Sequence, residues 1–128
     1  MTKHYVDIDG KWAVILAYDI GRDDLDEVSA WLDALGATER EIARARRVAM
    51  ATNSGFTFSD PTLRMSVVCL SQATSPDQWW DTMVHELKHV QSHVCHHYHI
   101  AEDSEDAAYL IGYLMRQIWR KTAKMRQK

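Results

Sequence analysis

The sequence predicts an α+β fold, in which a small sheet of about three strands packs on helices. Residues 12–20 form an uninterrupted apolar run with the length and the β-branched content of a buried strand. Two more strand-like segments, residues 54–59 and 64–71, lie on either side of an Asp-Pro break. The remaining segments are amphipathic and follow helix start signals, so we predict that they are helices.

Capping sequences and apolar spacing place the first two helices. Asp23 or Asp24 can cap a helix after the first strand, and Gly36 can end it. The apolar side chains of this helix recur at helical spacing: Leu25, Val28, Leu32 and Leu35. Thr38 and Glu41 then form a capping box, which predicts that a second helix begins there.

A long third helix is predicted to start after Ser75, with Pro76 at its first position, and to run to about residues 95–98. Its expected core stripe comprises Trp80, Met83, Val84, Leu87, Val90 and Val94. A last capping signal around Ser104 opens a fourth helix. The predicted order is therefore one strand, two helices, two strands and a closing pair of helices.

Length and composition favour a single domain over residues 1–128 that is soluble and cytoplasmic. The net charge of -3 gives no reason to expect nucleic acid or an anionic membrane as a partner. No signal peptide and no run of 18 apolar residues is recognisable, although a protein released by lysis or assembled into a particle would look the same. Cys69 and Cys95 are expected to be buried free thiols, and the basic residues 119–128 a solvated end.

The candidate metal ligands and the candidate catalytic base lie in the stretch His85-Glu86-Leu87-Lys88-His89. Residues four apart lie on one face of a helix, so His85 and His89 can direct two imidazoles at one zinc ion. Glu86 would sit beside the ion, where it can take a proton from zinc-bound water and later pass it to a leaving amine. His93 continues this face, and we expect it to be exposed or hydrogen-bonded, with a role at the metal as the alternative.

Catalytic zinc sites use three protein ligands, so a third must come from elsewhere in the chain. We predict Glu105, followed by Asp106 and Glu102, because a face of the fourth helix carries small residues that could pack on the motif helix. That face comprises Glu105, Ala108, Tyr109 and Gly112. Tyr109 and Tyr113 could donate a hydrogen bond to a developing oxyanion, and Tyr109 is preferred because it lies on this face. Alternatively, the Tyr109 ring could simply pack between the helices. Glu105 could equally serve the helix dipole.

At these residues the chain resembles the zincin metallopeptidases, of the gluzincin type with two histidines and a glutamate as ligands. The match comprises H-E-x-x-H at residues 85–89 and E-x-x-A at residues 105–108. With NSGFTF at residues 53–58 and RMSVVCL at residues 64–70, it is similar to small metallopeptidases of bacteria and their phages or mobile elements. The resemblance implies a minimal zincin fold, Zn²⁺ as cofactor, and a strand edge above the metal for an extended peptide.

Three functional hypotheses follow from these features. The first is a zinc metallopeptidase that hydrolyses a peptide or amide bond in a peptide or protein substrate, with Glu86 as its base. The second is a catalytically silent zincin-fold protein with a structural or binding role, for example in a phage particle or a regulatory complex. The third is a small helical interaction module in which the motif is accidental. The sequence identifies neither the substrate nor the oligomeric state.

Overall fold

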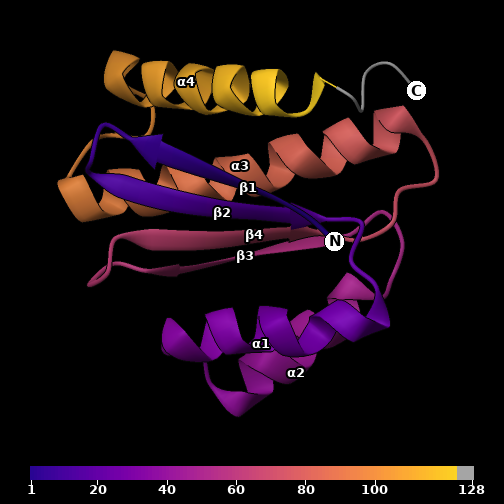
Figure 1. Cartoon of the computed structure of the whole chain (residues 1–128). Coiled ribbons are helices and arrows are strands. Elements are labelled where there is room, and N and C mark those ends of the chain that lie inside the picture. Colours follow the sequence, from indigo (N-terminus) through magenta and orange to yellow (C-terminus); the bar gives the residue numbers. More distant parts are fainter. Residues whose placement is uncertain (124–128) are drawn as a thin grey trace.

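The computed structural model describes residues 1–123 and has an α+β architecture in three layers, as the sequence predicted for the fold class. A mixed sheet forms the middle layer, with two helices covering each face (Figure 1). Of the basic C-terminal segment, residues 124–128 lie outside the described part. No helix within residues 1–123 is long and apolar enough to cross a membrane.

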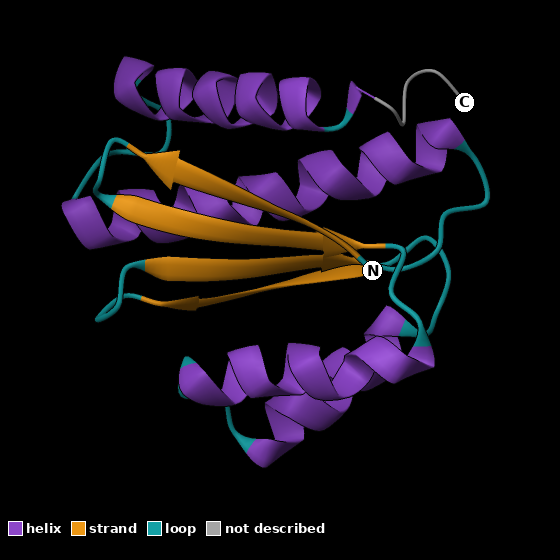
Figure 2. Cartoon of the chain, in the orientation of Figure 1, coloured by secondary structure: helices purple, strands orange, loops and turns teal. Residues whose placement is uncertain are grey.

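The sheet has four strands in the order β1-β2-β4-β3 (Figure 2). These are β1 (Thr2–Ile8), β2 (Trp12–Tyr18), β3 (Gly55–Asp60) and β4 (Met65–Leu70). The two central strands, β2 and β4, run parallel to each other, and each edge strand pairs antiparallel with its neighbour. Within residues 1–123, the outer edge of β3 therefore has no neighbouring strand.

The sequence-based expectation of three strands was wrong, because β1 was not foreseen. Its residues TKHYVDI carry charged, polar and aromatic side chains, and only Val6 and Ile8 are buried. An edge strand with one buried face gives a weak apolar signal, and here only its last half contributes to the core. Pairing with β2 through a tight turn at Asp9 and Gly10, both of positive φ, completes the strand.

One face of the sheet is covered by α1 (Leu25–Ala34), after a 3-10 turn (Arg22–Asp24), and by α2 (Glu39–Ala49). The predicted capping box opens α2: the Glu41 amide donates to the Thr38 hydroxyl, and the Thr38 amide donates to the Glu41 carboxylate. These helices cover the core side chains of β2 and β4 that point to this face. Phe56 and Phe58 of β3 pack there as well.

The other face is covered by α3 (Pro76–Tyr98) and α4 (Glu105–Lys121). The Ser75 hydroxyl accepts from the Gln78 amide at the start of α3, and the Ser104 hydroxyl accepts from the Ala107 amide at the start of α4, as the capping signals predicted. Most of the predicted stripe of α3 is buried: Met83, Leu87, Val90 and Val94. Val84 was wrongly included, since it is 47% exposed.

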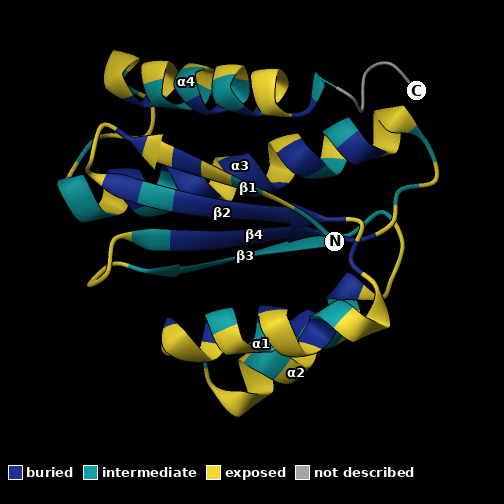
Figure 3. Ribbon diagram, in the orientation of Figure 1, coloured by how far each residue is buried: buried dark blue, intermediate teal, exposed yellow. Residues whose placement is uncertain are grey.

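Burial follows this layering. β2 and β4 are dark along most of their length in Figure 3, because helices cover both of their faces. Two hydrophobic clusters result, one between the sheet and α3 with α4, and one between the sheet and α1 with α2. The continuous apolar runs that predicted buried strands are thus explained by a sheet with no solvated face at its centre.

Candidate active site

Helix α3 holds the motif residues on its surface while its opposite side is anchored in the core. Met83, Leu87 and Val90 are fully buried, which fixes the rotation of the helix about its axis. His85 and His89 lie on the exposed side of the same helix, one turn apart. The site is therefore rigid at its base and open to solvent above the two imidazoles.

His85 and His89 turn their rings toward each other. Their Nε2 atoms are 3.3 Å apart, and the ring centroids are separated by 4.9 Å. Two nitrogens that each lie about 2.0–2.1 Å from a tetrahedral zinc ion are about 3.3–3.4 Å apart. The separation of the two Nε2 atoms is therefore the one expected for two zinc ligands, and it is also the length of an N–H···N hydrogen bond between the rings.

Glu86 lies beneath the pair and is only 4% exposed. One carboxylate oxygen, Oε1, accepts a hydrogen bond of 2.8 Å from the Thr57 hydroxyl, while the other, Oε2, is 3.9 Å from His85 Nε2. The Thr57 hydroxyl also lies 3.2 Å from the backbone carbonyl oxygen of Glu86. The carboxylate is thus held in one orientation, with one oxygen free on the side of the histidines.

Strand β3 approaches α3 closely beside Glu86, and the sequence analysis did not predict this contact. A Cβ atom on Gly55 would lie 2.8 Å from the Cys69 carbonyl oxygen and 3.0 Å from Glu86 Cγ. The lack of a side chain at Gly55 therefore lets the strand pass beside the glutamate, and Thr57 follows on the same face. The alternation of Phe56 and Phe58 with smaller residues was the available signal, since it places Gly55 and Thr57 on the opposite face.

His93 is a further polar residue on this side of α3, one turn beyond His89. Its Nδ1 atom is 2.6 Å from the Ser59 hydroxyl oxygen, so β3 supplies a partner for it as it does for Glu86. The rings of His89 and His93 are 6.4 Å apart between centroids, farther than those of the motif pair. Burial lowers the pKa of His93, and His89 adds to this effect while Glu102 opposes it.

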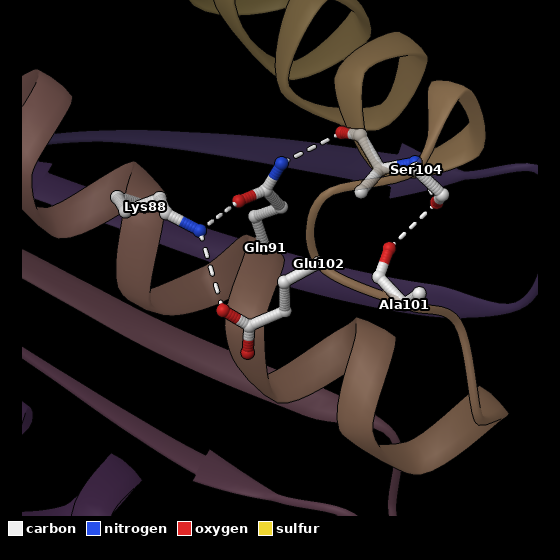
Figure 4. Close-up of polar contacts among 6 residues, drawn as sticks. Lys88, Gln91, Ala101, Glu102 and Ser104 are labelled. Carbon is white, nitrogen blue, oxygen red and sulfur yellow. Dashed lines mark hydrogen bonds and ion pairs between the residues drawn. The ribbon is translucent and has the colours of Figure 1, made fainter.

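The structure does not bring the first-choice third ligand to the histidines. Glu105 is exposed in the first turn of α4, and Asp106 lines a groove on the far side of that helix together with Ile8. Glu102, ranked last from sequence, lies nearest to the motif helix, where it forms an ion pair of 3.5 Å with Lys88 (Figure 4). Within residues 1–123, no group of three His, Cys, Asp or Glu side chains is assembled for a metal.

The face of α4 predicted to pack on the motif helix was wrong. The helix is rotated about its axis relative to this expectation, and its buried side chains are Ala107, Leu114 and Ile118. Ala108 and Gly112 are exposed, and nothing lies within 4 Å of a Cβ built on Gly112. The larger apolar area of leucine and isoleucine decides the rotation, because burial of those side chains releases more free energy than close contact through small residues.

This rotation also moves Tyr109 away from the histidine pair. Its side chain is 72% exposed, and it lines the groove between α4 and the β1–β2 turn with Tyr98 and Tyr113. The preferred oxyanion donor is therefore on the side of α4 away from the histidines, and the hydroxyl of Tyr113, the second candidate, donates to the Asp7 carbonyl oxygen. A hydrogen bond joins α4 to α3 instead: the Gln91 side-chain amide donates to the Ala107 carbonyl oxygen at 2.7 Å.

Comparison with known proteins adds no assignment to this geometry. No protein-family model matches the chain, and neither the curated proteins nor the solved structures contain a significant match.

Proposed function

We propose that this protein is a zinc-dependent hydrolase that cleaves a peptide or amide bond. The supporting observation is the convergence of the His85 and His89 Nε2 atoms to 3.3 Å above the buried carboxylate of Glu86. Two neutral imidazoles at this spacing suit zinc, and a carboxylate beside the ion rather than on it suits a general base. A purely structural metal site has no use for that carboxylate.

His85 and His89 would hold the zinc ion, and an acidic residue at the start of α4 would complete the protein ligands. Glu105 and Glu102 are the two candidates, and we treat them as alternatives. The ion pair that engages Glu102 is half exposed, with 53% of each side chain accessible, so its loss would cost little. Zinc bound there would lower the pKa of a coordinated water molecule toward about 7.

Glu86 performs the proton transfers in this proposal. Its free Oε2 accepts a proton from the attacking water as the new C–O bond forms at the substrate carbonyl. The same proton then passes to the amine as the C–N bond breaks, which leaves Glu86 ionised again. Thr57 acts through Glu86: its hydroxyl holds Oε1 at 2.8 Å and so keeps Oε2 on the reacting side.

The free edge of β3 supports an extended peptide as the substrate. Within the described residues, β3 pairs with β4 on one side only. A peptide that added to the other edge would bond to the β3 main chain and pass beside the exposed side of α3, where the histidines lie. This placement would bring one backbone amide of the peptide close to Glu86.

The first test is the zinc content of untagged protein by elemental analysis. We expect one zinc per chain in the wild type, loss in His85→Ala and His89→Ala, and retention in His96→Ala. His96 is the matched control because it is an exposed histidine of the same helix. Glu102→Gln and Glu105→Gln identify the third ligand, since only the substitution of the true ligand should lower the zinc content.

Each result of the zinc measurement has a different meaning for the proposal. Absence of zinc after reconstitution and dialysis would overturn the proposal and favour an accidental motif, in which case chelation would leave the melting temperature unchanged. Equal zinc content in His85→Ala and wild type would locate the metal elsewhere. With zinc established, Glu86→Gln should keep the metal and the fold but lose hydrolysis of a peptide library.

A catalytically silent binding role is the second candidate, and one observation favours it. The described residues do not gather a third metal ligand beside the histidine pair. A protein that keeps the zincin arrangement without turnover would tolerate Glu86→Gln in every functional assay. Full biological activity of that variant would support this second candidate over hydrolysis.

A further inference from the structure

A buried chain of hydrogen bonds ends at His93 and determines which of its ring nitrogens carries a proton. The chain runs from Trp12 in β2 through Ser66 in β4 and Ser59 in β3 to His93 in α3. The three distances are 2.9 Å, 2.7 Å and 2.6 Å. It therefore crosses three neighbouring strands of the sheet before it reaches the helix.

The donor and the acceptor of each bond follow from which groups in the chain carry a proton. The Trp12 indole N–H can only donate, so the Ser66 hydroxyl oxygen accepts. Ser66 is fully buried, and the acceptor that the described contacts give its own proton is the Ser59 hydroxyl. Ser59 then donates to Nδ1 of His93. A neutral His93 thus carries its proton on Nε2, the ring nitrogen that Ser59 does not engage.

The position of His93 along the helix sets what that proton can reach. His93 follows His89 by four residues, which is about 6 Å along a helix axis at about 1.5 Å per residue. An extended peptide advances about 3.3 Å per residue. The order of contacts, Thr57 to Glu86 and Ser59 to His93, indicates that β3 and α3 progress in the same direction. A peptide along β3 would therefore pass His93 about two residues from the histidine pair.

We propose that His93 is a substrate-binding residue that donates its Nε2–H to a backbone carbonyl of an extended peptide, about two residues from the amide bond held at His85 and His89. The inference rests on the proposed function for its ligand class. Ser59 is a positioning residue in this arrangement, because it acts through His93.

The protonation pattern is tested first, without any metal or substrate. Long-range ¹H–¹⁵N NMR of the imidazole rings at pH 8 should show His93 as the Nε2–H form in wild type. Ser59→Ala should shift His93 toward a mixture of the two neutral forms, and Ser59→Thr should restore the wild-type pattern. A predominant Nδ1–H form in wild type would overturn the inference.

Ligand binding is tested next with two hydroxamates of different length on zinc-loaded protein. Acetohydroxamic acid reaches only the metal, whereas a tripeptide hydroxamate extends past His93. We expect His93→Phe to weaken the tripeptide hydroxamate about tenfold, the value of one good hydrogen bond, and to leave acetohydroxamate affinity unchanged. His93→Gln, which keeps an N–H donor, should recover part of the loss. His96→Phe is the matched control and should change neither affinity.

The pair of ligands separates the possible failures. Equal tripeptide affinity in wild type and His93→Phe, with acetohydroxamate bound by both, would overturn this inference and leave the zinc site standing. Failure of wild type to take up zinc would overturn the proposed function and this inference with it. Loss of acetohydroxamate binding in His93→Phe would assign His93 to the metal site instead of to the peptide.

Discussion

At the scale of single residues, the orientation of the Glu86 side chain depends on a neighbouring strand. The motif sequence places the glutamate on α3, but its orientation comes from Thr57 of β3, whose hydroxyl bonds to the carboxylate at 2.8 Å. A carboxylate that is only 4% exposed needs such donors, because burial without a partner is costly. The orientation of the Glu86 carboxylate is therefore set by tertiary structure.

This dependence predicts the effect of Thr57→Val. The substitution preserves shape and removes the hydroxyl, so we expect a loss of about 2 kcal/mol in the free energy of unfolding, typical of a hydrogen bond to a buried charged group. Urea denaturation monitored by tryptophan fluorescence measures it. Thr57→Ser should retain most of the stability. Thr82→Val is the matched control, since the exposed Thr82 hydroxyl bonds only to its own helix, and a loss as large as in Thr57→Val would contradict the argument.

At the scale of elements, the contact between β3 and α3 depends on a glycine, whereas α4 carries a glycine that contacts nothing. A Cβ on Gly55 would be 3.0 Å from Glu86 Cγ of α3 and 2.8 Å from the Cys69 carbonyl oxygen of β4, whereas a Cβ on Gly112 would have nothing within 4 Å. The same chemical change should therefore have opposite effects at the two positions. This contrast tests the packing of both helices.

We predict that Gly55→Ala destabilises the protein by about 1–3 kcal/mol, because strand and helix must separate to admit the methyl group. Gly112→Ala should instead stabilise by up to about 1 kcal/mol, since alanine is the better helix former at an exposed position. Chemical denaturation of the two variants side by side provides the measurement. A destabilising Gly112→Ala would indicate that this face of α4 is packed after all, as the sequence suggested.

The unforeseen strand β1 can be tested through His4, whose Nε2 lies 2.9 Å from the Tyr18 hydroxyl of β2. Burial, with a smaller contribution from Lys121, lowers the pKa of His4 in the folded protein. The unfolded chain therefore binds a proton first as the pH falls through about 6.5, so this group reduces stability between that pH and its lower folded pKa.

We expect the free energy of unfolding to decrease from pH 7.5 to pH 5.5 in wild type, and to decrease less in His4→Gln. Urea titrations at the two pH values provide the comparison. His93, whose pKa is also lowered by burial, contributes equally to both proteins and cancels in the difference. An identical pH dependence in the variant would mean that β1 does not hold His4 against Tyr18.

At the scale of the whole molecule, the two cysteines report on the integrity of the core. Cys69 and Cys95 are free, and both are 0% exposed. Burial raises the pKa of each thiol, and Glu86 adds to the effect at Cys69. Both features suppress the thiolate that reacts with disulfide reagents.

We therefore predict that neither thiol reacts with an aromatic disulfide reagent at pH 8 in native buffer, whereas both react at once in urea. Any residual reaction in native buffer should follow the opening of the core, so its rate should rise in Gly55→Ala by about tenfold for each 1.4 kcal/mol of stability lost. Absorbance of the released thiolate measures it. Rapid modification of Cys69 in native wild type would contradict a sheet covered on both faces.

The sequence by itself determined the local features: the buried central strands, the capped helices and a histidine pair one turn apart with a glutamate between them. Each of these depends on interactions between residues close together in the chain, which periodicity and capping record directly. Only the tertiary structure decided the rest. The rotation of α4 turned Tyr109 away from the histidines, β1 joined the sheet through few buried side chains, and Thr57 and Ser59 reached Glu86 and His93. These outcomes depend on which apolar surfaces release most free energy when elements distant in sequence pack together, and no local pattern carries that comparison.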